Sequence, residues 1–174
     1  MTVDAFKSFS KKQLILLNWW TDSSPYKNRD AIICDGSVRS GKTVCMFLSF
    51  IFWAFYMFSD SSFAVCGKTI TSLRRNIITP MLPMLRSLGF TYEELVSKNM
   101  IIIKKDGREN RFYIFGGKDE GSAALIQGMT LSGVMLDETA LMPRSFCEQA
   151  IARCSVDNSR LWFNCNPENP AHWF

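Results

Sequence analysis

The sequence predicts an α/β domain in which a mostly parallel sheet lies between helices. Three observations predict this fold class. Short apolar runs alternate with stretches of helical spacing along the chain, which is typical of strand–helix–strand units. The apolar runs lack polar residues at alternate positions, so both faces of the sheet should be covered. A turn rich in glycine and serine joins the first apolar run to a long apolar helix.

The elements are expected in the following order. Ser10 can cap an N-terminal helix whose apolar positions include Leu14 and Leu17. The polar segment 21–30 is rich in Ser, Asp, Asn and Pro and predicts a loop. Residues 31–34 predict the first strand, and the long apolar helix should begin near Lys42.

The middle of the chain continues this alternation. Residues 63–66 predict a buried strand, and residues 69–88 predict a helix broken by Pro80 and Pro83. The polar turn 106–108 indicates a hairpin. The two strands of this hairpin are expected at 100–105 and 111–115. After the hairpin we expect a short helix at 122–127, a strand at 133–136, a helix at 145–153 and a strand at 161–164. No internal repeat or inner boundary is evident, so one domain is expected over 1–174.

Composition excludes several classes of protein. The chain has 174 residues, of which 47% are hydrophobic and 21% charged, and this excludes a disordered or collagen-like chain. The net charge of +4 permits contact with nucleic acid, but no block of Lys and Arg requires it. The apolar segment 44–58 is too short to span a bilayer of about 30 Å, so a buried helix is expected and no membrane contact.

Six cysteines are scattered through the chain without a Cys-x-x-Cys pair. The N-terminal residues lead into a polar segment with Lys11 and Lys12 rather than an apolar signal sequence. We therefore expect small buried thiols in a reducing, cytoplasmic compartment. The cysteines are Cys34, Cys45, Cys66, Cys147, Cys154 and Cys165.

The strongest motif is a phosphate-binding loop that matches G-x-x-x-x-G-K-[ST] in full, with a strand before it and a helix after it. Its residues are Gly36, Ser37, Val38, Arg39, Ser40, Gly41, Lys42 and Thr43. Successive N–H groups of such a loop face phosphate oxygens, and the following helix adds its positive end. Lys42 can reach the β- and γ-phosphates, and the Thr43 hydroxyl can ligate Mg²⁺. The motif predicts a nucleoside triphosphate site.

Arg39 lies within this loop, and two interpretations of it stay open. It can be a cation held over the γ-phosphate, where it would stabilise charge in the transition state. It can equally form an ordinary salt bridge or lie in solvent.

The predicted strand 133–136 is followed by two carboxylates, Asp137 and Glu138. Parallel strands present their carboxyl ends to the phosphate loop. Asp137 is therefore expected to hold Mg²⁺ together with Thr43, and Glu138 to orient and deprotonate the attacking water. A Glu directly after the Asp favours a hydrolysing ATPase of the additional-strand, catalytic-glutamate class of P-loop NTPases.

Two further amide groups are candidates. Asn164 ends the strand 161–164 and Asn166 follows it. A polar side chain at this strand end can contact the γ-phosphate and couple hydrolysis to movement, and an ordinary Asn-Pro turn is the alternative. Gln13 precedes the phosphate loop, and its amide offers both a donor and an acceptor to the edge of adenine. A solvated helix glutamine is about as consistent with its position.

Taken together, GSVRSGKT, LDETALMP and LWFNCNPENPAHWF resemble the large subunit of a tailed-phage terminase, most closely the type of PBSX-like prophages. The resemblance runs from about Ile32 to the last residue. It implies an ATPase motor in which Lys42 and Thr43 are the Walker A residues, and Asp137 and Glu138 the Walker B and catalytic pair. Arg39, Gln13 and Asn164 to Asn166 then match the loop arginine, the adenine-motif glutamine and the coupling motif.

The resemblance also implies partners. A homo-oligomeric ring of such subunits, with the terminase small subunit and the portal protein, would drive double-stranded DNA into a procapsid in the host cell cytoplasm, using ATP and Mg²⁺. The family carries a C-terminal nuclease domain that nothing in 1–174 matches. Since Phe174 comes soon after the coupling motif, this segment is expected to be an ATPase domain incomplete at its C-terminus. Two alternatives stay open: another nucleic-acid ATPase of helicase type, and a nucleotide-binding fragment without activity of its own.

Overall fold

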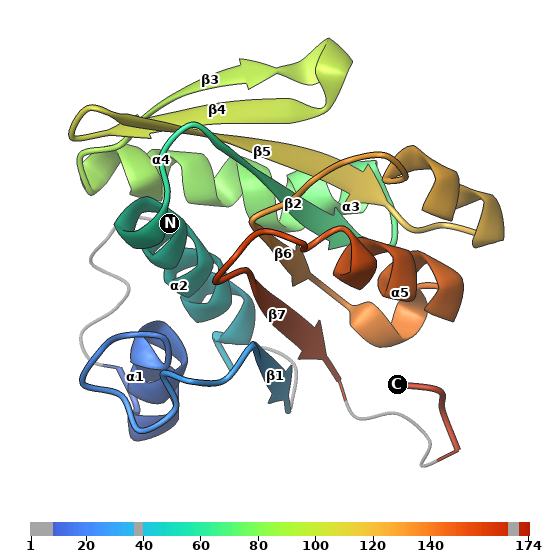
Figure 1. Ribbon diagram of the computed structural model, residues 1–174, viewed down its shortest axis with the longest axis horizontal. Helices are drawn as coiled ribbons and strands as arrows, with labels where there is room; N and C mark the ends of the chain where they lie inside the picture. The colour runs from blue at the N-terminus through green and yellow to red at the C-terminus, as the bar shows by residue number, and fades with distance from the viewer. Residues whose placement is uncertain (1–8, 37–39, 167–170) are drawn as a thin grey trace.

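A computed structural model describes residues 9–36, 40–166 and 171–174, and within them a seven-stranded sheet with the order β1-β7-β6-β2-β5-β4-β3 (Figure 1). The strands are β1 (Ala31–Asp35), β2 (Ser61–Gly67), β3 (Thr91–Leu95), β4 (Met100–Lys105), β5 (Arg108–Gly116), β6 (Gly133–Leu136) and β7 (Arg160–Cys165). The α-helices are α1 (Lys11–Asn18), α2 (Lys42–Met57), α3 (Ile70–Leu73), α4 (Thr79–Ser87) and α5 (Arg144–Ala152). Short 3-10 segments lie at Val96–Lys98, Glu120–Leu125 and Thr139–Leu141.

The sheet is parallel over most of its width. Strands β1, β7, β6, β2 and β5 pair in parallel with their neighbours, while β4 and β3 add two antiparallel strands at one side. The predicted mostly parallel sheet is therefore confirmed. Because the parallel strands point the same way, their carboxyl ends meet at a single edge.

Helices cover both faces of the sheet, as Figure 1 shows. Side chains of β2 alternate between two cores. Phe63 and Val65 pack in a core with residues of α1, α2 and α4. Ala64 and Cys66 pack on the other face with α5, including Phe146. The molecule thus has three layers, with the sheet in the middle.

The long apolar helix α2 lies within the larger core, with ten buried residues. Among the described residues, no helix is long and apolar enough to cross a membrane. The buried Ser49 hydroxyl of α2 accepts hydrogen bonds from the indole N–H groups of Trp20 and Trp162, each at 3.2 Å. All six cysteine thiols are free, and five of them are buried.

Two local predictions are confirmed in detail. Ser10 caps α1 in a capping box with Gln13, in which each residue bonds the backbone N–H of the other. The predicted hairpin is the pair β4–β5, which turns over Asp106 and Gly107 with φ of 49° and 77°. Two consecutive left-handed residues are typical of the tight type I′ turn.

Two local predictions are corrected by the structure. The segment 69–88 is helical almost throughout and is not broken at its prolines. A π-helical turn at Arg74–Ile78 precedes Pro80, and the Thr79 N–H donates to Arg74 O five residues earlier. Pro80 has no N–H group to donate, and the change from α- to π-helical hydrogen bonding occurs just before it. The antiparallel strand β3 was not predicted, because its sequence TYEEL is largely polar and exposed.

Candidate functional site

Several of the residues singled out in the sequence lie at the edge where the parallel strands end. Strand β1 leads into Gly36, and β6 ends directly before Asp137. Strand β7, which lies between β1 and β6, carries Asn164 near its end. Thr43 is in the first turn of α2, so three strand ends and one helix N-terminus meet here.

The phosphate loop is held from both sides. Lys42 Nζ donates to Gly36 O and to Asn166 Oδ1, the latter at 3.4 Å, so the lysine joins the start of the loop to the end of β7. Gly41 has φ of 78°, and a Cβ there would lie 2.9 Å from Gln13 Nε2. Only glycine meets both conditions without strain.

Three predicted loop residues, Ser37, Val38 and Arg39, lie outside the described residues. Of the remaining loop members, Gly36, Ser40 and Lys42 line a cavity beside the loop, and Thr43 contacts Asn164.

Asn164 connects the two residues predicted to hold Mg²⁺. Its Nδ2 donates to Thr43 Oγ1 at 3.1 Å and to Asp137 Oδ1 at 2.5 Å. The three side chains come from α2, from β7 and from the residue after β6, so this contact joins the central elements of the site. Asn166 lies two residues further on and contacts Lys42 instead.

Asp137 is buried, and its backbone N–H donates to Cys66 O at 2.8 Å. Burial raises the pKa of its carboxyl from 3.8 to about 6, because the charged form loses solvent. The hydrogen bond from Asn164 and the charge of Lys42 act in the opposite direction. A cation at this carboxylate would offset the cost of burying its charge.

Glu138 is half-buried and has left-handed backbone angles, with φ of 52° and ψ of 46°. Such a conformation is costly for a residue other than glycine and persists where neighbours impose it. The buried hydroxyl of Thr139 lies 3.2 Å from Leu136 O and 3.1 Å from Asn164 O. Lys68 Nζ donates to Leu141 O at 2.7 Å, so the turn that carries Glu138 is tied at both ends.

The sequence interpretation missed the roles of Thr139 and Lys68. Thr139 directly follows the acidic pair, and this proximity is the one signal that could have identified it. Nothing in the local sequence around Lys68 points to the carbonyl of Leu141, which is 73 residues away along the chain.

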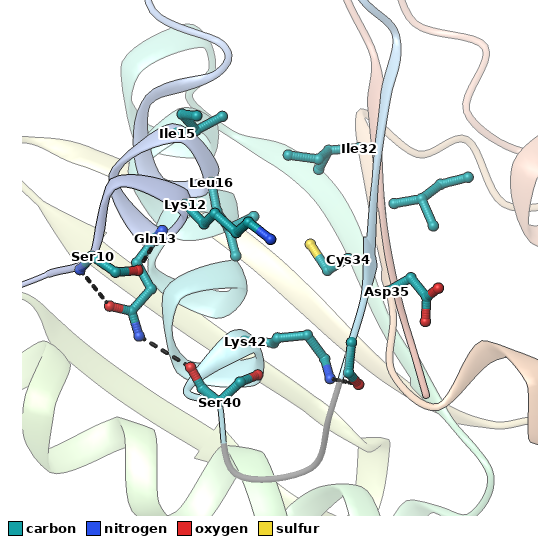
Figure 2. A pocket seen from close by; sticks show the side chains of 12 residues that line it. Ser10, Lys12, Gln13, Ile15, Leu16, Ile32, Cys34, Asp35, Ser40 and Lys42 are labelled. Atoms are coloured by element: carbon teal, nitrogen blue, oxygen red, sulfur yellow. Dashed lines mark hydrogen bonds between the residues drawn. The ribbon is translucent and has the colours of Figure 1, made fainter. Parts of the chain in front are cut away.

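A cavity of about 420 Å³ lies between α1 and β1, next to the phosphate loop (Figure 2). Its wall is apolar at Ile15, Leu16 and Ile32, and its polar end includes Ser40 and Lys42. This combination suits a flat base with phosphates attached.

Gln13 also lines this cavity, and both atoms of its amide are engaged (Figure 2). Oε1 accepts from Ser10 N–H at 2.8 Å, and Nε2 donates to Ser40 O at 3.1 Å. The structure therefore brings Gln13 to the phosphate loop.

The donor set at Asp137 fits Mg²⁺. Thr43 and Asp137 offer oxygen atoms, which Mg²⁺ prefers, and Mg²⁺ usually takes only one or two protein ligands beside phosphates and water. In the described part of the chain no three His, Cys, Asp or Glu side chains cluster as a metal site. Thr43 and Asp137 thus suit a cation whose other ligands are phosphate and water oxygens.

Comparison with known families identifies the family of the chain. Residues 33–174 match the family described as "Terminase large subunit, T4likevirus-type, N-terminal". A search of curated proteins finds no match.

Solved structures of phage proteins resemble the chain. The large terminase of a thermophilic bacteriophage superimposes with a TM-score of 0.93 at 54% identity, covering 97% of this chain and 41% of that one. The same protein in complex with ADP gives a TM-score of 0.93 at 52% identity, with 95% and 41% covered. The chain thus spans about 41% of the length of these relatives.

A more distant structure shares the fold alone. The ATPase domain of the large terminase of Thermus phage P74-26 gives a TM-score of 0.60 at 16% identity, covering 80% of this chain and 60% of that one. The likeness supports the α/β architecture with its mostly parallel sheet.

Proposed function

The chain belongs to the terminase large-subunit family, and we propose on that premise that it is an ATP-hydrolysing motor subunit that packages double-stranded DNA into a procapsid. One observation carries the ATPase part of this proposal. Asn164 joins Thr43 of the phosphate loop to Asp137 after β6, so the groups that would hold Mg²⁺ and the groups that would bind phosphate form one connected site. The terminase of the thermophilic phage, which was solved with ADP and with ATP-γ-S, supports a nucleotide as the ligand.

In the proposed mechanism the backbone N–H groups of the loop and Lys42 would bind the phosphates, and Thr43 and Asp137 are the residues that would hold Mg²⁺. The cation, when bound, neutralises developing charge on the β- and γ-phosphates. Glu138 orients a water molecule and takes its proton as the water attacks the γ-phosphate. Its left-handed backbone supports this role, because strained residues gather at active sites.

Base recognition is proposed for the cavity between α1 and β1. Gln13 lines it and is the candidate for reading the adenine edge. To do so its amide would exchange the bonds to Ser10 and Ser40 for bonds to the base, while Ile15 and Ile32 would contact the faces of the ring.

The partners belong to the same proposal. We expect the double-stranded DNA, the portal protein, the terminase small subunit and other copies of the chain in a ring to act in the host cell cytoplasm. DNA contact would be made mainly with phosphates and would weaken with salt. Asn164 and Asn166 would couple loss of the γ-phosphate to movement. In support, Asn164 contacts Thr43 and Asp137, the proposed ligands of Mg²⁺, and Asn166 contacts Lys42.

Substitution of Glu138 tests the hydrolytic role. Glu138→Gln keeps the size of the side chain and removes the base, so turnover should fall by about 10²–10⁴-fold while ATP affinity stays close to that of the wild type. Steady-state phosphate release and equilibrium binding of ATP measure the two quantities. Glu148→Gln on the exposed part of α5 is the matched control and should hydrolyse normally. Near-normal turnover of Glu138→Gln would contradict the assignment.

Arg39 is proposed to stabilise the transition state in cis. Arg39→Ala should then reduce the turnover number far more than it reduces nucleotide affinity, because the charge it offsets develops only during the reaction. Parallel measurement of the turnover number and of the ATP dissociation constant decides the matter. Equal losses in both would leave Arg39 as an ordinary ground-state contact.

A further inference from the structure

The side chain of Asn164 is buried at the centre of the site, with 6% of its surface exposed. Its Nδ2 donates to two oxygen atoms, while its Oδ1 is buried and finds no donor among the described residues. The orientation of the amide follows from its neighbours, because an ionised carboxylate at Asp137 can only accept. A buried acceptor without a donor is unfavourable, so its presence at this point needs an explanation.

The two hydrogen bonds of Asn164 Nδ2 place the amide between Thr43 and Asp137. One nitrogen donates to both Thr43 Oγ1 and Asp137 Oδ1, so lone pairs of both oxygens are directed at the same amide group. These are also the two protein oxygens proposed as ligands of Mg²⁺. A cation held by both would need lone pairs directed at a common point between them, and the amide group already uses such lone pairs.

We propose that the Asn164 amide and the divalent cation compete for Thr43 and Asp137, so that the cation binds only when Asn164 releases them. This inference rests on the proposed function, since it takes the cation to arrive with a nucleotide. Asn164 is in this view a positioning residue. It holds Thr43 and Asp137 close together and releases both side chains when the cation binds.

The surroundings of Asn164 indicate which part of the residue moves. Its backbone carbonyl is within 3.1 Å of the Thr139 hydroxyl, and its strand β7 is paired on both sides, with β1 and β6. The backbone is therefore held, so release of the two ligands would require a turn of the side chain. A turned amide would direct Oδ1 towards the site, where the hydroxyl hydrogen of Thr43 or a cation-bound water could serve as its donor.

The competition predicts a measurable change in the linkage between Mg²⁺ and nucleotide. The quantity to measure is the ratio of the ADP dissociation constant in EDTA to that in Mg²⁺. In Asn164→Ala this ratio should rise on the order of tenfold, because the cation no longer has to displace hydrogen bonds that involve a charged group. ADP is the appropriate probe because it lacks the γ-phosphate, so an amide that only sensed that phosphate would leave the ratio unchanged. An unchanged or smaller ratio in Asn164→Ala overturns the inference.

Asn166→Ala is the matched control. It removes an amide from the end of the same strand, but that amide contacts Lys42 rather than Thr43 and Asp137. Its effect on ADP affinity should be the same with and without Mg²⁺, so the ratio should stay at the wild-type value. A rise as large as that of Asn164→Ala would mean that the effect is not specific to the amide between the two ligands, and the inference would fail.

A second variant tests the position of Asn164 without any nucleotide. Asn164→Asp keeps the shape of the side chain but places a second carboxylate beside Asp137. In EDTA its melting temperature should be below that of the wild type because of like-charge repulsion, and Mg²⁺ alone should raise it by more degrees than it raises the wild type. An equal response of the two proteins to Mg²⁺ would show that residue 164 does not lie where a cation binds.

The two sets of measurements separate this inference from the proposed function. Failure of the wild type to bind ADP in either buffer contradicts the ATPase proposal. In that case the response of Asn164→Asp to Mg²⁺ alone still decides whether residue 164 marks the position of a cation.

Discussion

At the level of single residues, Asp137 is a carboxylate whose burial disfavours its charged form. Burial raises the pKa of its carboxyl to about 6, and the hydrogen bond from Asn164 only partly offsets the effect. Glu138, the next residue, holds a left-handed backbone. Both features cost stability in the absence of a ligand, as is common for residues that bind or react.

The pKa of Asp137 predicts how stability depends on pH. In the unfolded chain the carboxyl titrates near 3.8 and in the folded chain near 6. The folded state therefore binds the proton more tightly, and the free energy of unfolding should fall as pH rises from about 4 to about 6 and then level off. Asp137→Asn removes this penalty, so in EDTA it should raise the free energy of unfolding on the order of 3 kcal/mol at pH 7.5 and have little effect near pH 4. Denaturant titrations at the two pH values measure the difference.

The control for this prediction is Asp106→Asn. Asp106 lies on the β4–β5 turn, where its side chain is 84% exposed, so its substitution should change stability by less than about 0.5 kcal/mol at both pH values. If Asp137→Asn stabilised the protein equally at pH 4 and pH 7.5, the explanation by burial of charge would be wrong.

At the level of elements, a single buried serine connects the apolar helix α2 to its neighbours. The helix passes through the larger core, and its Ser49 hydroxyl accepts from the indole N–H groups of Trp20 and Trp162. One of these donors precedes the helix in the chain, and the other is on β7. Ser49 therefore links α2 to the strand that carries Asn164.

Replacement of Ser49 by alanine should destabilise the protein even though alanine favours the helix. The two indole N–H groups would lose their acceptor, at a cost of about 1–3 kcal/mol for a buried donor, against a gain of roughly 0.5 kcal/mol in helix propensity. We expect a net loss of about 0.5–2.5 kcal/mol in the free energy of unfolding, measured by urea titration. Ser87→Ala at the exposed end of α4, where the hydroxyl bonds only its own helix, is the matched control. A Ser49→Ala protein as stable as the wild type would contradict the role of this acceptor.

At the level of the whole molecule, the site depends on the sheet. Strand β7 lies between β1 and β6, and this order brings the phosphate loop, Asn164 and Asp137 to one edge although they are far apart in the sequence. A ligand that bridges these elements binds only the folded chain, so binding should stabilise the domain as a unit.

This coupling predicts a rise in melting temperature with nucleotide. At a concentration of Mg²⁺ and ADP about 100 times the dissociation constant, the free energy of unfolding should rise by about 2.7 kcal/mol, which corresponds to roughly 5–10 °C for a chain of this size. Thermal scans with increasing ADP measure the effect. Lys42→Ala should lose most of the shift, because the lysine borders the cavity next to the loop. An equal shift in Lys42→Ala would mean that ADP binds elsewhere.

The sequence alone determined those features whose signals are local. The cap at Ser10, the turn at Asp106 and Gly107, the phosphate loop and the acidic pair after β6 are each read from a few consecutive residues. The helix α2 and most strands follow from apolar runs of suitable length. These signals were sufficient to predict the fold class, because alternating strands and helices have few ways to pack.

Contacts between distant segments became visible only in the folded chain. Local periodicity does not state which strands pair, so it did not show that Asn164 contacts both Thr43 and Asp137, that Gln13 reaches Ser40, or that Lys68 holds Leu141. The polar strand β3 was missed for the same reason, since it is a strand by virtue of its pairing with β4 rather than by its own pattern. Side chains that are adjacent in a folded site are brought together by packing of the whole chain. This packing cannot be inferred from any short stretch of sequence.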